Sequence, residues 1–200
     1  MNNFENLLKR GGYVSFLPLF KELDARLSEG KDLIVAIDGG SASGKTTLAS
    51  LICEAFDAVV FHMDDFFLPF EMRTSERLLE AGGNVHRERF LSEVLLPLSR
   101  KEAVMYRKFD CSTGTLSEPI SVTPKRLTVI EGAYSLHPEL CSYYDFTVLL
   151  EVDKKTQAQR ILERDASKAE RFFNEWIVYE DTYFEKTGIR SRCDLIINTK

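Results

Sequence analysis

The sequence predicts a three-layer α/β/α fold with a five-stranded parallel sheet at its centre. Short apolar runs alternate along the chain with amphipathic helical stretches, and this order is typical of parallel strands covered by helices on both faces. A glycine-rich segment joins the first run to the helix that follows it. The 200 residues are 44% hydrophobic, which is enough for one sizeable core, so we expect a single domain over 1–200.

Five apolar runs supply the predicted strands. Each is short and consists mainly of apolar residues, as is typical of a parallel strand that is buried on both faces. Helical stretches separate several of the runs, so crossover connections between parallel strands are expected. The runs cover residues 32–38, 58–63, 127–130, 146–150 and 195–198.

Apolar residues at helical spacing predict the covering helices. Apolar and charged positions mix over 15–28, which predicts an N-terminal helix ending near Gly30. Leu48, Leu51, Ile52 and Ala55 recur at i, i+3, i+4 and i+7, so 46–56 is predicted to be a helix. Further helices are predicted over 87–99, 154–165 and about 169–186.

Two segments differ from this regular alternation. Residues 103–125 contain Gly, Ser and Pro between short apolar stretches, which predicts a small β insertion. The stretch 172–186 carries aromatic residues at spacings of mostly three or four. That pattern favours a helix that packs on the core, whereas a cap over a bound adenine ring is an alternative without support in the pattern.

Composition and charge exclude several classes of function. Lys and Arg number 26 and Asp and Glu number 31, for a net charge of −5, so DNA or RNA is not the expected partner. The first residues carry charges without a signal-type apolar region, and no apolar run approaches the ~20 residues that span a membrane. The four cysteines form no C-x-x-C pair. We expect a cytoplasmic protein without a membrane partner, and a homo-oligomer is compatible with the sequence.

The segment GGSASGKTT at 39–47 matches the phosphate-loop pattern G-x-x-x-x-G-K-[ST]. A predicted strand precedes it and a predicted helix follows, so the segment predicts a P-loop NTPase fold with bound ATP and Mg²⁺. An ordinary glycine-rich turn would explain the glycines but not the Lys–Thr pair. Lys45 is expected to reach the β- and γ-phosphates and Thr46 to ligate Mg²⁺. The expected ATP-binding residues are Gly39, Gly40, Ser41, Ala42, Ser43, Gly44, Lys45, Thr46 and Thr47.

Carboxylates follow two of the predicted strands. Asp64 and Asp65 come just after one run, and Glu131 ends another. Ligands of parallel α/β sheets gather at the carboxyl ends of the strands, where the phosphate loop also lies. One of the two aspartates is therefore expected to orient an acceptor hydroxyl and take its proton, and Glu131 to hold Mg²⁺. The alternatives are a solvated aspartate pair in a turn and an acidic cap.

Six short segments, in this order over most of the chain, resemble motifs of the uridine kinase family and its relatives, which include phosphoribulokinase and bacterial pantothenate kinase. The phosphate loop alone is generic to P-loop proteins, whereas the ordered set is much more specific. The segments are GGSASGKTT at 39–47, MDDFF at 63–67, GGNVHRERF at 82–90, KFD at 108–110, VIEG at 129–132 and RILERD at 160–165.

The resemblance implies a role for individual residues. It makes Asp64 the catalytic base, close to the metal, and Glu131 a residue near the metal. It also implies a helical lid over about 154–187 that carries Arg160, Arg164 and Asp165 and brings the arginines to the ATP phosphates. Phe109 and Asp110 would form a wall of the substrate pocket. Two further positions hold other residues than the nucleoside kinases of the family have. His86 stands where those kinases have a carboxylate that binds ribose, and Phe67 stands where they commonly have a tyrosine. The substrate-binding residues expected are Asp65, Phe67, His86, Phe109 and Asp110.

These observations predict an ATP-dependent kinase that phosphorylates a hydroxyl group of a small molecule. The leading hypothesis is a uridine kinase-like enzyme acting on the 5′-hydroxyl of a nucleoside. Another acceptor, such as pantothenate, a nicotinamide nucleoside or a sugar phosphate, is the alternative within the same class. A nucleotide-dependent switch or assembly ATPase is the alternative from another class, although the sequence lacks the base-recognition pattern N-K-x-D of GTPases.

Overall fold

The computed structural model describes residues 3–200, apart from the side chains of Asn3 and Asp165. Its centre is a sheet of five parallel strands in the spatial order β2-β7-β1-β8-β9. Each strand agrees with its predicted run to within one residue at either end, which confirms the α/β fold class. The strands are β1 (Leu33–Gly39), β2 (Ala58–His62), β7 (Leu127–Glu131), β8 (Phe146–Glu151) and β9 (Leu195–Asn198).

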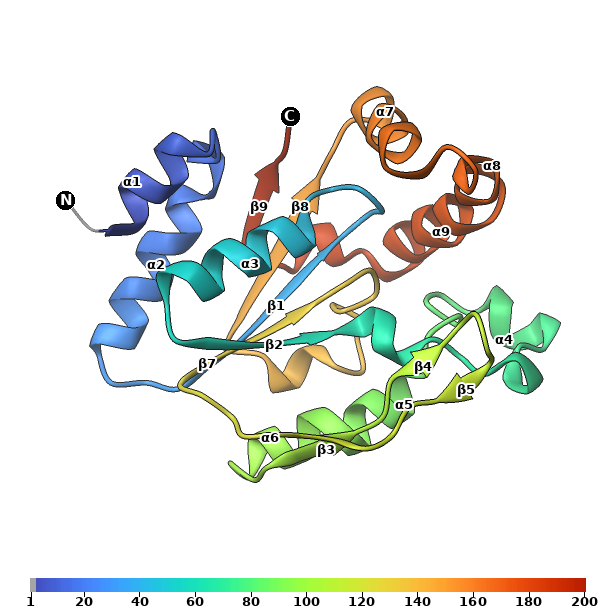
Figure 1. Ribbon diagram of the computed structural model, residues 1–200, viewed down its shortest axis with the longest axis horizontal. Coiled ribbons are helices and arrows are strands. Elements are labelled where there is room, and N and C mark those ends of the chain that lie inside the picture. Colours follow the sequence, from blue (N-terminus) through green and yellow to red (C-terminus); the bar gives the residue numbers. More distant parts are fainter. Residues whose placement is uncertain (1–2) are drawn as a thin grey trace.

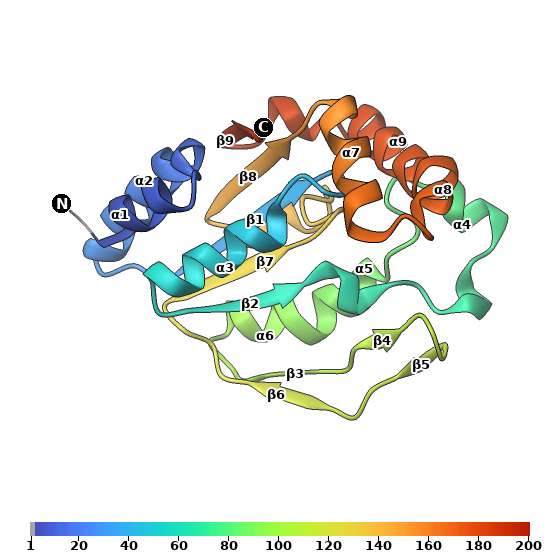
Figure 2. The same cartoon turned by 45° about the horizontal axis from the view of Figure 1, so that its top comes forward.

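Helices cover both faces of the sheet, as Figures 1 and 2 show. Side chains of successive strand residues point to opposite faces, so Val35 and Ile37 of β1 pack against the first helical layer and Ala36 against the second. Both sides of each central strand are therefore buried, which explains the continuous apolar runs. The first layer contains α1 (Asn3–Arg10), α2 (Leu17–Ser28) and α3 (Lys45–Ala55), and the second contains α5 (Arg87–Phe90), a π-helical turn (Leu91–Leu95) and α6 (Leu96–Ser99).

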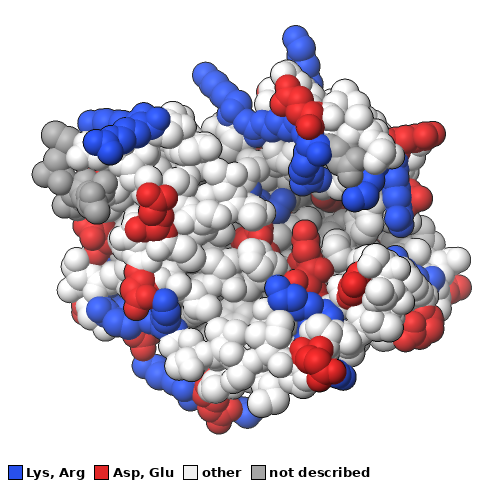
Figure 3. Space-filling view, viewed as in Figure 1, with Lys and Arg blue, Asp and Glu red and all other residues white. Residues whose placement is uncertain are grey.

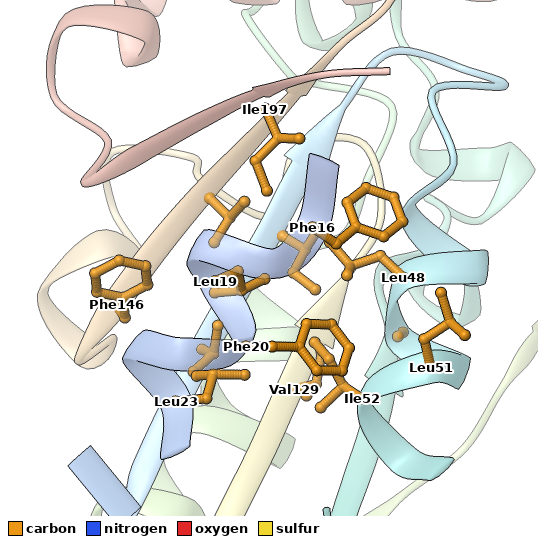
Figure 4. Packing of buried hydrophobic residues seen from close by; sticks show 14 of the residues in the cluster. Phe16, Leu19, Phe20, Leu23, Leu48, Leu51, Ile52, Val129, Phe146 and Ile197 are labelled. Atoms are coloured by element: carbon orange, nitrogen blue, oxygen red, sulfur yellow. The ribbon is translucent and has the colours of Figure 1, made fainter. Parts of the chain in front are cut away.

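The N-terminal segment differs from the prediction of one helix over 15–28. The chain forms α1, a 3₁₀ turn η1 (Val14–Phe16) and then α2. Helix α1 has eight residues, and a helix of that length is marginal on its own in water. It is stabilised by packing, because Phe4 is buried and its ring lies 5.8 Å from the ring of Phe20. Figure 4 shows how Phe16 and Phe20 then pack beside α3.

Two further segments extend from the sheet layers. The predicted β insertion consists of two antiparallel pairs, β3 (Val104–Tyr106) with β6 (Ile120–Val122) and β4 (Phe109–Asp110) with β5 (Thr115–Leu116). The helical segment α7 (Lys154–Asp165), α8 (Ala169–Arg171), a π-helical turn (Phe172–Trp176) and α9 (Ile177–Thr187) lies beside the carboxyl edge of the sheet. The short helix α4 (Ser75–Leu79) lies in the connection between β2 and α5.

Two sequence expectations concern cysteines and membranes. All four cysteines are free. Within residues 3–200, none of the helices combines the length and apolar character needed to cross a bilayer.

Candidate active site

The phosphate loop connects β1 to α3 and depends on glycine at both of its ends. Gly39 has a φ of +151°, and a Cβ atom there would lie 2.4 Å from the carbonyl oxygen of Leu150. Gly44 has a φ of +98° and immediately precedes the first residue of α3. Only glycine adopts such conformations at low cost. The loop therefore closes over the N-terminus of α3, an arrangement that binds phosphate through backbone N–H groups and the helix dipole.

Lys45 supplies a positive charge to this loop. Its Nζ atom donates hydrogen bonds to the carbonyl oxygens of Gly39, at 2.8 Å, and Gly40, at 3.0 Å. The ammonium group therefore lies against the loop itself.

The register of the sheet brings Glu131 to the loop. Glu131 pairs with Ile37 of β1 on one side and with His62 of β2 on the other, so all three residues lie at the same edge. Its carboxylate is buried and accepts a hydrogen bond from Oγ1 of Thr46 at 3.3 Å. The Nδ1 atom of His62 lies 2.5 Å from the same carboxylate oxygen, and this contact raises the pKa of His62.

Thr46 and Glu131 offer oxygen ligands that suit Mg²⁺. In kinase sites this ion is held by one or two protein groups together with substrate phosphates rather than by a protein cage. The described side chains contain no cluster of three His, Cys, Asp or Glu that could hold a metal on their own. The donor set therefore fits an ion that arrives with a nucleotide.

The two adjacent aspartates have different environments. Asp64 is open to the cleft on one side and surrounded by protein on the others, and this desolvation raises its pKa while Lys45 opposes the rise. The carboxylate of Asp65 instead lies 3.1 Å from Nζ of Lys108 and accepts a hydrogen bond from the hydroxyl of Tyr106 at 3.3 Å. Asp65 thus attaches the β insertion to the end of β2, and Asp64 is the one that faces the cleft.

Basic residues of α7 and α8 border the same cleft. Arg164 lies over the ring of Phe172 at 5.0 Å, and Arg171 lies over the ring of Trp176 at 5.6 Å. Arg160 has a different environment, because its guanidinium donates to the carbonyl oxygen of Ala42 at 3.1 Å and to that of Lys200. Arg160 therefore holds the phosphate loop and the end of the chain together, whereas Arg171 also pairs with Glu175 on the surface.

These groups meet in one cleft with a volume of about 1310 Å³. In Figure 3 the surface is hollowed beside the region of α7 and α8, where Lys and Arg side chains gather on one rim, and acidic side chains lie within and below the hollow. Lys45, Thr46, Asp64 and Glu131 all line it. The arrangement combines a phosphate-binding loop, cations and carboxylates around a space large enough for a nucleotide and a second small molecule.

The chain matches a model of the phosphoribulokinase/uridine kinase family over residues 34–175. The chain belongs to this family. It is 27% identical to a uridine kinase of Oceanobacillus iheyensis over 158 residues, covering 72% of this chain and 73% of that protein. A uridine kinase of Geobacillus sp. (strain WCH70) is 30% identical over 153 residues, with 70% and 71% covered.

A solved structure supports the fold of this P-loop kinase. The structure of a possible uridine kinase from Bacillus stearothermophilus has a TM-score of 0.64 and 24% identity, and the match covers 84% of this chain and 89% of that one. Together with the family match, this likeness confirms the predicted resemblance and the P-loop fold.

The remaining residues predicted to bind substrate occupy several places in the kinase. Phe67 borders the cleft, where its ring lies 5.1 Å from that of Trp176. His86 faces Glu88 at 3.2 Å and caps the start of α5 by accepting from the N–H of Arg89. Phe109 is buried edge-on against Phe70, and Asp110 caps the turn after β4, where Ser112 donates to it. The structure thus brings Phe67 to the cleft and gives the other side chains contacts outside its lining.

The aromatic residues of segment 172–186 have two kinds of environment in the kinase. Tyr183 is buried in the core and contacts the rings of Tyr134 and Phe184, as the core-packing prediction expects. Phe172 and Trp176, however, line the cleft. The pattern did not separate these two groups because a helix that lies between a core and a cleft has apolar residues on both faces.

Sequence reasoning missed Glu180, which holds the phosphate loop from α9. Its carboxylate is buried and accepts from the N–H of Ser41 at 2.8 Å and from Oγ of Ser41 at 2.5 Å. Gln157 of α7 adds a third contact by donating to the carbonyl oxygen of Ser41 at 2.9 Å. The only signal was an acidic residue within an aromatic helix, in the segment WIVYEDTYF.

Asp38, at the end of β1, was also missed. It is fully buried, and its carboxylate accepts from the N–H of Leu136 at 2.8 Å, the N–H of Tyr134 at 3.1 Å and the hydroxyl of Tyr183 at 2.8 Å. One carboxylate therefore joins β1, the loop after β7 and helix α9. Desolvation raises its pKa from 3.8 to about 6, against the opposing effect of these hydrogen bonds.

This shift predicts a pH-dependent part of the stability. The folded state holds the proton of Asp38 more tightly than the unfolded state, so the contribution is complete below about pH 4 and is lost as the pH rises through about 6. We expect the unfolding free energy of the wild type, minus that of Asp38→Asn, to increase by about 2 kcal/mol between pH 7 and pH 4. Denaturant unfolding at several pH values measures it, and a constant difference would contradict the assignment.

Proposed function

We propose that this P-loop kinase transfers the γ-phosphate of ATP to a hydroxyl group of a small molecule, namely the 5′-hydroxyl of a nucleoside. One observation carries the proposal, namely that Asp64 and Glu131 lie beside Lys45 and Thr46 in a single cleft. The uridine kinases to which the chain is similar support the choice of a nucleoside. Another acceptor, such as a sugar phosphate, is the alternative within the same class of enzyme.

The residues of the loop bind and orient the nucleotide in this proposal. Backbone N–H groups at the N-terminus of α3 and the ammonium of Lys45 hold the β- and γ-phosphates. The hydroxyl of Thr46 and the carboxylate of Glu131 would hold Mg²⁺, with Asp64 close by, and the bound ion would neutralise phosphate charge. The short contacts of Ser41 with Glu180 and Gln157 fix the loop before the nucleotide binds.

Asp64 is the general base of the proposed reaction. Its raised pKa makes it a better proton acceptor than an ordinary surface aspartate, and it is open to the space in which an acceptor would bind. The proton of the hydroxyl moves to this carboxylate as the oxygen attacks the γ-phosphorus, and the bond from that phosphorus to the β–γ bridging oxygen breaks to release ADP. Asp65 is not positioned for this task, because its carboxylate is engaged with Lys108 and Tyr106.

Helices α7–α9 act as the lid of the proposed site. Arg164 and Arg171 face the cleft from the lid and would exchange their contacts with aromatic rings for contacts with phosphate oxygens. Trp176 and Phe67, which touch each other across the cleft, close the acceptor side. Exclusion of water by these groups prevents hydrolysis of ATP in place of transfer.

A panel of acceptors tests the proposal. The purified protein with Mg·ATP is given uridine, cytidine, other nucleosides, pantothenate and ribulose 5-phosphate in separate reactions, and release of ADP is followed. We expect ADP release that depends on an added nucleoside, and formation of its 5′-monophosphate. ADP release that depends only on another acceptor would support the kinase activity and exclude a nucleoside as the substrate. Release that is independent of every acceptor would favour the ATPase switch.

A further inference from the structure

The cleft extends beyond the phosphate loop to a wall that the family match does not include. On this side it is lined by residues 11–16, which follow α1, and by residues 198–200 at the end of β9. Both segments lie outside the matched residues 34–175. The acceptor side, with Asp64, Phe67 and Trp176, is the other part of the lining. A nucleotide bound to the loop would therefore lie between two ends of the cleft that have different linings.

The orientation of the loop decides which end takes the base of the nucleotide, if the proposed function is correct. The γ-phosphate lies toward Lys45 and Asp64, so the α-phosphate and the nucleoside lie toward the opposite side, near the first turn of α3. The end of β9 is attached at this point, because Oγ1 of Thr199 donates to the carbonyl oxygen of Ser43 at 2.9 Å. Arg160 reinforces the attachment through Ala42 and Lys200.

The N-terminal segment is held at the same place. Phe16 is buried in one core cluster with Leu48 of α3 and Ile197 of β9, and Figure 4 shows its ring beside Leu48. The ring of Tyr13 stacks on that of Phe16 at 5.8 Å. Between these anchors, Val14 is 51% exposed and lines the cleft. An apolar side chain thus lies at the border of the cleft, on the side to which the nucleoside would point.

We propose that residues 11–16 and 198–200 form the binding site for the heteroaromatic base of the nucleoside triphosphate, with Val14 in contact with the face of the base. Apolar contact on a ring face, with a few polar groups at its edge, is the usual composition of such sites. Asn198 and the backbone of residues 198–200 supply the polar groups. The N-terminal helices α1 and α2 would then contribute to nucleotide affinity as well as to the core.

The experiment compares ATP with inorganic tripolyphosphate, each with Mg²⁺, by isothermal titration calorimetry. Tripolyphosphate occupies the phosphate loop but has no base. The variant is Val14→Asn, which is polar but uncharged, so phosphate binding is not altered by a new charge. Val178→Asn is the matched control, because Val178 is also an exposed valine, at 52%, and does not line the cleft.

We expect Val14→Asn to weaken ATP binding by about three- to tenfold, because the variant loses the contact of one apolar side chain with the base. Binding of tripolyphosphate should be unchanged. Val178→Asn should bind both ligands as the wild type does. If Val14→Asn binds ATP as tightly as the wild type does, the proposed base site is wrong. An equal loss of affinity for ATP and tripolyphosphate would also contradict it. Neither result would contradict the proposed kinase function. A wild-type protein that binds neither ligand would overturn the base site and the proposed function together.

Discussion

Replacing Lys45 by alanine is expected to abolish turnover, by at least about 10³-fold, because the side chain supplies the charge that the terminal phosphates meet in the loop. The fold should be retained. Lys45 is the first residue of α3 and its contacts are with the loop carbonyls of Gly39 and Gly40, and alanine is the strongest helix former. Steady-state release of ADP with the acceptor identified by the panel measures the loss.

Lys125→Ala is a matched control for the Lys45 variant. Lys125 is exposed, and its Nζ atom forms a surface ion pair with Asp57, so its loss should change turnover by less than about twofold. Thermal unfolding of both variants separates a loss of chemistry from a loss of fold. A Lys45→Ala enzyme that retains a tenth of the wild-type rate would show that Lys45 does not bind the transferred phosphate as proposed.

Replacing Asp64 by asparagine is expected to lower turnover by ~10²-fold or more while ATP still binds, because general-base assistance is typically worth ~10²–10⁴-fold. Asparagine has nearly the same shape but does not accept a proton at neutral pH. The loss should appear in kcat more than in the KM of the acceptor. Rates with saturating acceptor, together with calorimetry of Mg·ATP, measure the two effects separately.

Two comparison variants sharpen the Asp64 test. Asp181→Asn changes an exposed aspartate of α9 that pairs with Lys154 on the surface, and its turnover should match that of the wild type. Asp65→Asn should loosen the β insertion, since it removes the charge partner of Lys108, and it should retain more turnover than Asp64→Asn. If Asp65→Asn loses more turnover than Asp64→Asn, then the base is Asp65.

The sequence by itself determined the sheet, the phosphate loop and the edge at which the chemistry is placed. Strands such as β1 and β7 are buried on both faces, so most of their residues are apolar, and that pattern is visible without coordinates. The loop needs glycine at positions 39 and 44 for local backbone reasons. Glu131 and Asp64 follow strands directly, and parallel strands bring such residues to one edge.

Only the tertiary structure decided which side chains face the cleft and which hold the framework. Asp64 and Asp65 are neighbours in the chain, and the partners that separate them, Lys108 and Tyr106, come from a distant insertion. Glu180 reaches Ser41 across 139 residues. Such contacts depend on how whole elements pack, and no periodicity or local spacing encodes them, so a buried carboxylate such as Glu180 has the same appearance in the sequence as a solvated one.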